Sequence, residues 1–277
     1  MTADTIIFSK YHGTGNDFIM IDNRAKTFPV KRGLISAMCN RHFGIGADGL
    51  ILIENHPSLD FTMRYFNADG KESTMCGNGG RCAVAFAGSL GLVKGNRVPF
   101  MAPDGEHQAE IQNNIISLKM RDVLSVEQHD EYFFMNTGSP HYVTFVENID
   151  DLDVVTLGRR IRYAEAFKPG GTNVNFARHL EPGKIYNRTY ERGVENETLS
   201  CGTGSVAAAI SAAILRQYDI NSITVRTPGG ELTVRFQPEP GGRFADIRLE
   251  GPAVFVFSGT VNTTDIEFQS KFNLPNQ

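Results

Sequence analysis

The sequence predicts an α+β protein of two pseudo-symmetric halves, each a mostly antiparallel sheet wrapped around one central helix. Three observations support this prediction: a cysteine-glycine motif that occurs twice, a run of small apolar residues of helical length after each copy, and short β-rich runs flanking both. A chain of 277 residues is long enough for two domains of ordinary size.

The repeat is the strongest of these signals. Around Cys76 the chain reads MCGNGGRCAVAFAG, and around Cys201, 125 residues later, it reads SCGTGSVAAAISAA. Thr14-Gly15-Asn16 is echoed by Thr137-Gly138-Ser139, and Gly46-Ala47-Asp48 by Gly171-Thr172-Asn173, at nearly the same offset. Several matches in one order at one offset indicate a duplicated fold.

In the first half, runs of β-branched and aromatic residues between turn signals predict strands over 6–9, 18–22, 50–54, 61–66, 97–101 and 115–120. A short helix is expected over 33–42, and the long central helix follows Cys76.

The second half repeats this order. Strands are expected over 132–136, 142–146, 174–178, 185–190, 223–226, 231–236, 245–250 and 254–258, with a short helix over 156–163. The alanine-rich stretch 206–213 predicts a buried central helix, because small side chains let a sheet approach closely.

These elements place the first half at 1–125, with Cys76, and the second at 126–260, with Cys201, joined by a polar linker over 122–130. The C-terminal segment 261–277, with a strand around 266–268, is expected to join the first sheet. The active site is expected in the cleft between the halves.

Composition narrows the function. A net charge of −4 with interspersed cations carries no basic footprint for nucleic acid. No apolar run approaches the roughly 20 residues of a membrane span, and the N-terminus lacks a signal-peptide pattern. We therefore expect a cytoplasmic protein that binds neither nucleic acid nor membrane.

Four cysteines are expected to be reduced thiols, and neither their spacing nor that of the histidines indicates a metal site. Cys39 and Cys82 are interpreted as core residues; the counterpart of Cys82 in the second half is Ala207. Cys76 and Cys201 differ, because each precedes a glycine-led helix start.

At such a start, unpaired backbone N–H groups and the helix dipole stabilise an anion, so a thiol ionises more readily there. Gly77 and Gly202 remove side chains that would keep a ligand from the backbone. Two such thiols suggest inversion of an amino-acid stereocentre: a thiolate removes the α-proton and a thiol protonates the opposite face. No cofactor is expected, so helix N-termini would help to stabilise the carbanion.

The runs HGTGNDFIMID, FNADGKESTMCGNGGRC and YERGVENETLSCGTGSVAAA, with GIGADG and TNVNF between them, resemble the diaminopimelate epimerase family over essentially the whole chain. The resemblance implies the family's duplicated fold and, usually, a homodimer. It also implies a pyridoxal-independent interconversion of LL- and meso-2,6-diaminopimelate in lysine and peptidoglycan precursor synthesis.

The resemblance also implies roles for individual residues. Cys76 and Cys201 match the acid/base cysteines, and His141 and Glu191 match the pair that tunes them. The matching substrate-binding residues are Asn16, Asn67, Gly77, Asn78, Asn173, Glu191, Arg192, Gly202 and Thr203, and Arg192 is the one expected to bind the distal carboxylate. The chain departs from the family at Ser139, where asparagine is common, which puts substrate affinity in question.

Three alternatives stay open. Proline or hydroxyproline racemases share the two-cysteine architecture but typically have histidine where Asn78 stands. An isomerase of the phenazine-biosynthesis type would lack the paired cysteines. A thiol-redox or ligand-binding protein on this scaffold would use a disulfide as its working state, or no chemistry at all.

Overall fold

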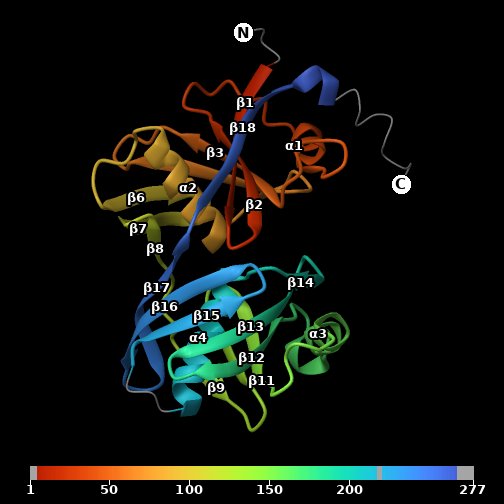
Figure 1. The fold of residues 1–277 in the computed structure, drawn as a ribbon, viewed down its shortest axis with the longest axis vertical. Helices are drawn as coiled ribbons and strands as arrows, with labels where there is room; N and C mark the ends of the chain where they lie inside the picture. Colours follow the sequence, from red (N-terminus) through yellow and green to blue (C-terminus); the bar gives the residue numbers. More distant parts are fainter. Residues whose placement is uncertain (1–4, 217–219, 267–277) are drawn as a thin grey trace. The chain divides into compact units, whose positions relative to one another are not determined.

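The computed structural model describes residues 5–216 and 220–266, and the chain divides into two compact units (Figure 1). The first unit comprises residues 1–116 and 253–277, and the second comprises 117–252. Each unit is built from many strands and one long helix, as expected of the α+β class.

The strands of the first unit are β1 (Thr5–Gly13), β2 (Asn16–Asp22), β3 (Gly49–Glu54), β4 (Phe61–Asn67), β5 (Glu72–Ser73), β6 (Arg97–Ala102), β7 (Gly105–Gln112) and β18 (Val254–Asn262). β8 (Ile115–Lys119) spans the boundary between the units. The strands of the second unit are β9 (Val126–Gln128), β10 (Phe133–Asn136), β11 (Pro140–Phe145), β12 (Asn173–Glu181), β13 (Lys184–Glu191), β14 (Asn196–Thr198), β15 (Ser222–Thr227), β16 (Gly230–Glu239) and β17 (Arg243–Pro252).

The two units use one pairing scheme. In the first, β1 pairs with β2 antiparallel, β2 with β3 parallel, β3 with β4 antiparallel and β4 with β6 parallel. In the second, β10, β11, β12, β13 and β15 pair in the same sequence of directions. This shared topology confirms the duplicated fold that the repeat predicted.

A long helix lies among the strands of each unit (Figure 1). In the first unit, α2 (Gly77–Ser89) packs against β1, β2, β3 and β4. In the second, α4 (Gly202–Arg216) packs against β10 to β13 and β15 to β17, and every side chain of its stretch 206–213 is buried. The small residues of both helices allow this close approach of surrounding strands.

A shorter helix covers another part of each sheet. In the first unit, Leu34, Ile35 and Met38 of α1 (Arg32–Cys39) pack into a core with residues of β2 and β3. In the second, Val154 of α3 (Val154–Arg162) packs against Val174 and Tyr190. A single 3₁₀ turn, Glu165–Phe167, follows α3.

The observed division differs from the expected one at both ends. The stretch 122–130, expected as a polar linker, contains β9, which pairs with β10, and Val123, which bridges Phe244. The strand expected over 254–258 in the second half is β18, which pairs along β1 in the first unit. Hydrogen bonding to an edge, which composition does not reveal, decides both memberships.

The C-terminal prediction is partly testable. Ile266, the one described residue of the strand expected around 266–268, lies in a helical turn over 263–266 and packs into the core of the first unit with Phe8 and Phe28. The expected strand residues 267 and 268, and the rest of the segment to 277, lie outside the described residues. Among the described residues, no helix is long and apolar enough to cross a membrane.

Candidate functional site

Cys76 is the residue immediately before α2. Its backbone is extended (φ −99°, ψ 134°), and its carbonyl accepts the first helical hydrogen bond from Gly80 N at 2.7 Å. The helix therefore begins beside the sulfur, and the N–H groups of its first turn lie where they stabilise an anion. This is the placement that the Cys-Gly-x-Gly motif predicted.

Two amide side chains lie next to this thiol. Asn16, at the start of β2, accepts from Cys76 Sγ through Oδ1 at 3.6 Å and from Asn78 Nδ2 at 3.3 Å. Asn78, in the first turn of α2, is only 1% exposed. The structure thus brings together three predicted site residues of the first unit.

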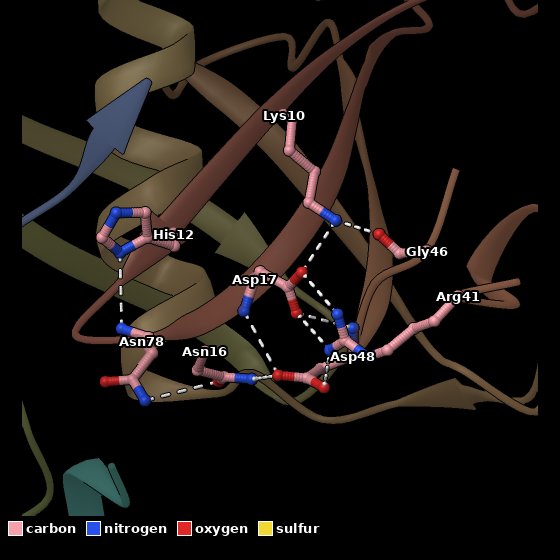
Figure 2. Close-up of polar contacts among 9 residues, drawn as sticks. Lys10, His12, Asn16, Asp17, Arg41, Gly46, Asp48 and Asn78 are labelled. Carbon is pink, nitrogen blue, oxygen red and sulfur yellow. Dashed lines mark hydrogen bonds and ion pairs between the residues drawn. The ribbon is translucent and has the colours of Figure 1, made fainter. Parts of the chain in front are cut away.

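A charged cluster holds the other side of Asn16 (Figure 2). Asn16 Nδ2 donates to Asp48 Oδ2 at 2.7 Å, and Arg41 Nη2 contacts both Asp48 Oδ1 and Asp17 Oδ1 at 2.7 Å. Lys10, nearly buried, pairs with Asp17 at 2.8 Å and donates to the Gly46 carbonyl. Although burial opposes ionisation, hydrogen bonds from Arg41 and Lys10 lower the pKa of Asp17 to about 2.

Arg81 lies behind the start of α2 and has no exposed surface. Its Nη2 donates to Asn78 Oδ1 at 3.0 Å and to Thr14 Oγ1 at 3.4 Å, and its Nη1 donates to the Gly77 carbonyl at 3.5 Å. Burial lowers the pKa of this guanidinium from its usual value, but an arginine stays charged in proteins. A buried cation thus lies directly beneath the Cys76 loop.

Asn67 is set apart from this group. Its backbone closes the turn to Gly70, with Gly70 N donating to Asn67 O at 2.8 Å, and its side chain is exposed. The predicted role of Asn67 in substrate binding stays a prediction.

Cys201 occupies the equivalent place before α4 and is 7% exposed. Its carbonyl accepts from both the backbone N and the Oγ of Ser205, at 2.9 Å each, which defines the first turn. Its Sγ lies 3.5 Å from Thr203 Oγ1, and the Thr203 carbonyl accepts from Thr137 Oγ1 at 2.9 Å. Both cysteines therefore precede their helices in the same manner.

His141, on β11, is fully buried and connects to Cys201 through Thr203. Its Nε2 lies 3.0 Å from Thr203 Oγ1, and its Nδ1 lies 3.0 Å from Asn175 Nδ2. Because Asn175 Oδ1 accepts from Thr189, the Asn175 amide donates to Nδ1, which leaves the proton of the neutral ring on Nε2. Burial and the positive charge of Arg192 lower the pKa of His141 to about 3, so the ring is neutral at neutral pH.

Asn173 and Arg192 are joined through Ser139, the residue at which the chain departs from the family. Asn173 Nδ2 donates to Ser139 Oγ at 2.9 Å, and Arg192 Nη2 donates to the same oxygen at 3.3 Å. Asn173 Oδ1 accepts from Arg192 N at 2.8 Å, and Arg192 Nη1 donates to the Gly170 carbonyl at 3.3 Å. The shorter serine therefore serves as an acceptor that orients a predicted substrate-binding arginine.

Glu191, the last residue of β13, accepts from Thr198 Oγ1 at 3.1 Å. The predicted influence of its carboxylate on a thiol stays a prediction.

Cys39 and Cys82 behave as core residues. Both are buried, and burial raises the pKa of each thiol to about 12. Within the described residues, no cluster of histidine, cysteine and carboxylate side chains has the geometry of a metal site.

Sequence reasoning did not single out Asp48, Arg81 or Asn175. Asp48 is part of the repeat and Asn175 lies in the run TNVNF, but neither pattern predicts a role in the site for these residues. A signal for Arg81 was present, because it is the one charged residue in the otherwise small and apolar run 77–89, where the second copy has Val206.

Comparison with known proteins supports the same interpretation. A family model described as diaminopimelate epimerase matches residues 8–122 and 133–256. The diaminopimelate epimerase of Flavobacterium psychrophilum is 53% identical over 91% of this chain and 98% of its own length. That of Chlorobaculum tepidum is 45% identical over 90% of this chain and 98% of its own length.

Solved structures share the fold at low identity. A Bacillus anthracis phenazine biosynthesis protein of the PhzF family superposes with a TM-score of 0.75 at 14% identity, covering 93% of this chain and 99% of that one. A hydroxyproline epimerase from Agrobacterium vitis superposes with a TM-score of 0.65 at 14% identity, covering 94% and 93%. With both the family model and close relatives matching nearly its full length, the chain belongs to the diaminopimelate epimerase family.

Proposed function

We propose that this protein interconverts LL- and meso-2,6-diaminopimelate without pyridoxal, using Cys76 and Cys201 as its two proton carriers. The observation that carries the proposal is the equivalent placement of these two thiols, each at the N-terminal end of the buried central helix of its unit. The membership of the chain in the family supports the choice of substrate.

In the proposed reaction one thiolate takes the α-proton, so the C–H bond breaks, an S–H bond forms and the electron pair stays on carbon. The other thiol then gives its proton to the opposite face of that carbon and becomes the thiolate. The hard step is the carbanion, and the N–H groups at the helix starts, beside Gly77 and Gly202, would hold the adjacent carboxylate and disperse its charge.

The polar residues around each thiol fit a substrate with an amino and a carboxyl group at both ends. Asn16, Asn67, Asn78, Asn173 and Thr203 would bind these groups. Arg192 would bind the distal carboxylate, because a guanidinium offers bidentate geometry and Ser139 and Gly170 O already orient it. His141 and Glu191 would tune the thiols, His141 acting through Thr203.

The product is a precursor of lysine and of peptidoglycan, and a mechanism that needs two reduced thiols suits the cytoplasm.

We also propose a homodimer. The four consecutive side chains Val254, Phe255, Val256 and Phe257 of β18 are 41%, 51%, 51% and 45% exposed, and a second copy of this chain would cover them. Val256→Lys should convert the dimer to a monomer, as measured by multi-angle light scattering. Val194→Lys, at an exposed site of the second unit, should leave the dimer intact. If both variants were monomers, the result would count against this surface.

The function is tested by incubating the reduced protein with LL-diaminopimelate in deuterated water without added cofactor. We expect the meso isomer to form with deuterium at the inverted α-carbon. Cys76→Ala and Cys201→Ala should each lower epimerisation by about a thousandfold. One of the two variants should still exchange the α-proton of the LL isomer with retention, because its remaining thiol can return deuterium to the face it came from.

Cys82→Ala is the matched control, since it removes a buried cysteine of α2 whose counterpart is already Ala207. It should turn over normally. Full turnover by either catalytic-cysteine variant would exclude the two-thiol mechanism, and turnover of proline or hydroxyproline instead of diaminopimelate would indicate a racemase of the same fold.

A further inference from the structure

The side chains that flank Cys76 form a chain of hydrogen bonds whose direction can be deduced from chemistry alone. Arg81 Nη2, Asn78, Asn16 and Asp48 follow one another at 3.0, 3.3 and 2.7 Å. A guanidinium can only donate and an ionised carboxylate can only accept, so both ends of this chain are chemically unambiguous.

These two ends fix the two amides between them. Asn78 must turn its oxygen to Arg81, which leaves its NH₂ facing Asn16. Asn16 must turn its NH₂ to Asp48, which leaves its oxygen facing Asn78. Both requirements agree on the same orientation of Asn16, and this does not depend on how the amide atoms are assigned.

As a result, Asn16 presents a carbonyl oxygen to Cys76, 3.6 Å from Sγ. A carbonyl accepts a hydrogen bond from a thiol but repels a thiolate, so this orientation favours the protonated form of Cys76. It opposes the helix N-terminus and the charge of Arg81, both of which favour the thiolate.

Asp48 can hold Asn16 firmly because it is itself anchored. Arg41 bridges Asp48 and Asp17, and Asp17 N donates to Asp48 Oδ2 at 3.2 Å. Asp17 is secured in turn by Lys10 at 2.8 Å. The cluster in Figure 2 thus holds the side chain of Asn16, whose Oδ1 lies 3.6 Å from Cys76 Sγ.

We propose that Asp48 and Arg81 are positioning residues that lock the amide of Asn16 with its carbonyl toward Cys76 and thereby keep this thiol poised as a proton donor. The orientation follows from the hydrogen-bond chain alone, while its use in proton transfer rests on the function proposed above.

The test measures the reactivity of Cys76 directly. The full chain is alkylated with iodoacetamide between pH 6 and 10, and the rate at Cys76 is followed by peptide-resolved mass spectrometry. In Asp48→Asn the NH₂ of Asn16 or Arg41 must face another NH₂, so the anchor is lost. We expect the pH of half-maximal alkylation at Cys76 to fall by about half a unit.

Removing a negative charge near a thiol would lower this midpoint by itself, so a second background separates the two causes. In Asn16→Leu there is no amide to orient, so Asp48→Asn should produce only the smaller shift that the loss of charge causes. The other charged and titratable groups are the same in each pair of chains: Arg81 and Cys82 of α2, Asp104 beside Met75, and Lys10, Asp17 and Arg41 around Asp48. Asp22→Asn, which breaks an exposed pair with Arg24 on the same strand β2, is the matched control and should leave the midpoint unchanged.

A shift of equal size in both backgrounds would show that Asp48 acts only through its charge and would overturn the proposal. The absence of a shift from Asp48→Asn in the chain that keeps Asn16 would overturn it as well. Since alkylation requires no substrate, either result is distinguishable from a failure of the epimerase assay.

Discussion

The starts of α2 and α4 are two copies of one structure with opposite surroundings. Each begins directly after a cysteine whose carbonyl accepts from the residue four positions on. Around Cys76 the supporting groups are the ions Asp48 and Arg81, whereas the equivalent positions around Cys201 hold Asn173 and Val206.

The hydrogen bonds beside the two thiols also run in opposite directions. In the first unit Asn16 donates to Asp48 and offers an acceptor to its thiol. In the second, His141 donates from Nε2 to Thr203, whose hydroxyl proton is then available to Cys201. In the proposed mechanism, these different neighbours favour Cys76 as the proton donor and Cys201 as the proton acceptor.

The largest difference between the two helix starts is expected on truncation of the side chains at the equivalent positions 81 and 206. Arg81→Ala removes a large, fully buried side chain together with its hydrogen bonds to Asn78 and Thr14, so it should cost about 3–5 kcal/mol of unfolding free energy. Val206→Ala removes only two methyl groups and should cost about 1–2 kcal/mol. Urea titration of both variants measures the difference; equal costs would mean that the buried cation is not integral to the first unit.

Acid should affect the second unit before the first. The pKa of His141 is lowered to about 3 by burial and by Arg192, so the unfolded chain takes up a proton below about pH 6.5 that the folded chain does not. Stability should fall by up to about 1.4 kcal/mol per pH unit from pH 6.5 downward. The pKa of Asp17 is lowered to about 2, so its contribution to the free energy of unfolding is lost only below about pH 3.8.

Unfolding free energies between pH 7 and 4 check this order. His141→Gln should flatten the slope in that range, and Asp17→Asn should leave it unchanged. A slope that persists in His141→Gln would assign the acid sensitivity to other groups.

The paired glycines of the two motifs should tolerate alanine differently. A Cβ at Gly204 would lie 2.4 Å from Asn175 Oδ1, whereas one at Gly79 would lie 3.2 Å from the flexible end of Ile51. We expect Gly204→Ala to cost about 2 kcal/mol and Gly79→Ala less than about 1 kcal/mol, by the cost of overpacking. Thermal unfolding of the two variants decides whether the second helix start is the more tightly packed.

The smallest expected effect concerns the donor to Cys201. Thr203→Val removes the hydroxyl 3.5 Å from Sγ and should raise the alkylation midpoint of Cys201 by about half a pH unit. Thr203→Ser keeps the hydroxyl and should restore the original midpoint. A lower midpoint in Thr203→Val would reverse the assignment of donor and acceptor.

Much of the fold follows from local patterns. Apart from the strand expected around 266–268, the expected strands and helices are present within a few residues, because alternation and small-residue runs report burial directly. The short strands β5, β9 and β14 and the strand β7, whose exposed positions are polar, carry too few apolar residues to be seen in the sequence.

The repeat in the sequence predicted the two thiols and their helix starts, since a repeated motif encodes local backbone geometry. The resemblance to the family added Asn16, Asn78, Asn173 and Thr203 as predicted substrate-binding residues. The folded structure was needed to show that β18 belongs to the first unit, that Ser139 contacts Arg192, and that Asp48 and Arg81 flank the Asn16–Asn78 pair. These contacts could not be predicted because a hydrogen bond between residues distant in sequence leaves no trace in the periodicity or spacing of either segment. The polarity of that bond depends on which donor or acceptor the fold places opposite.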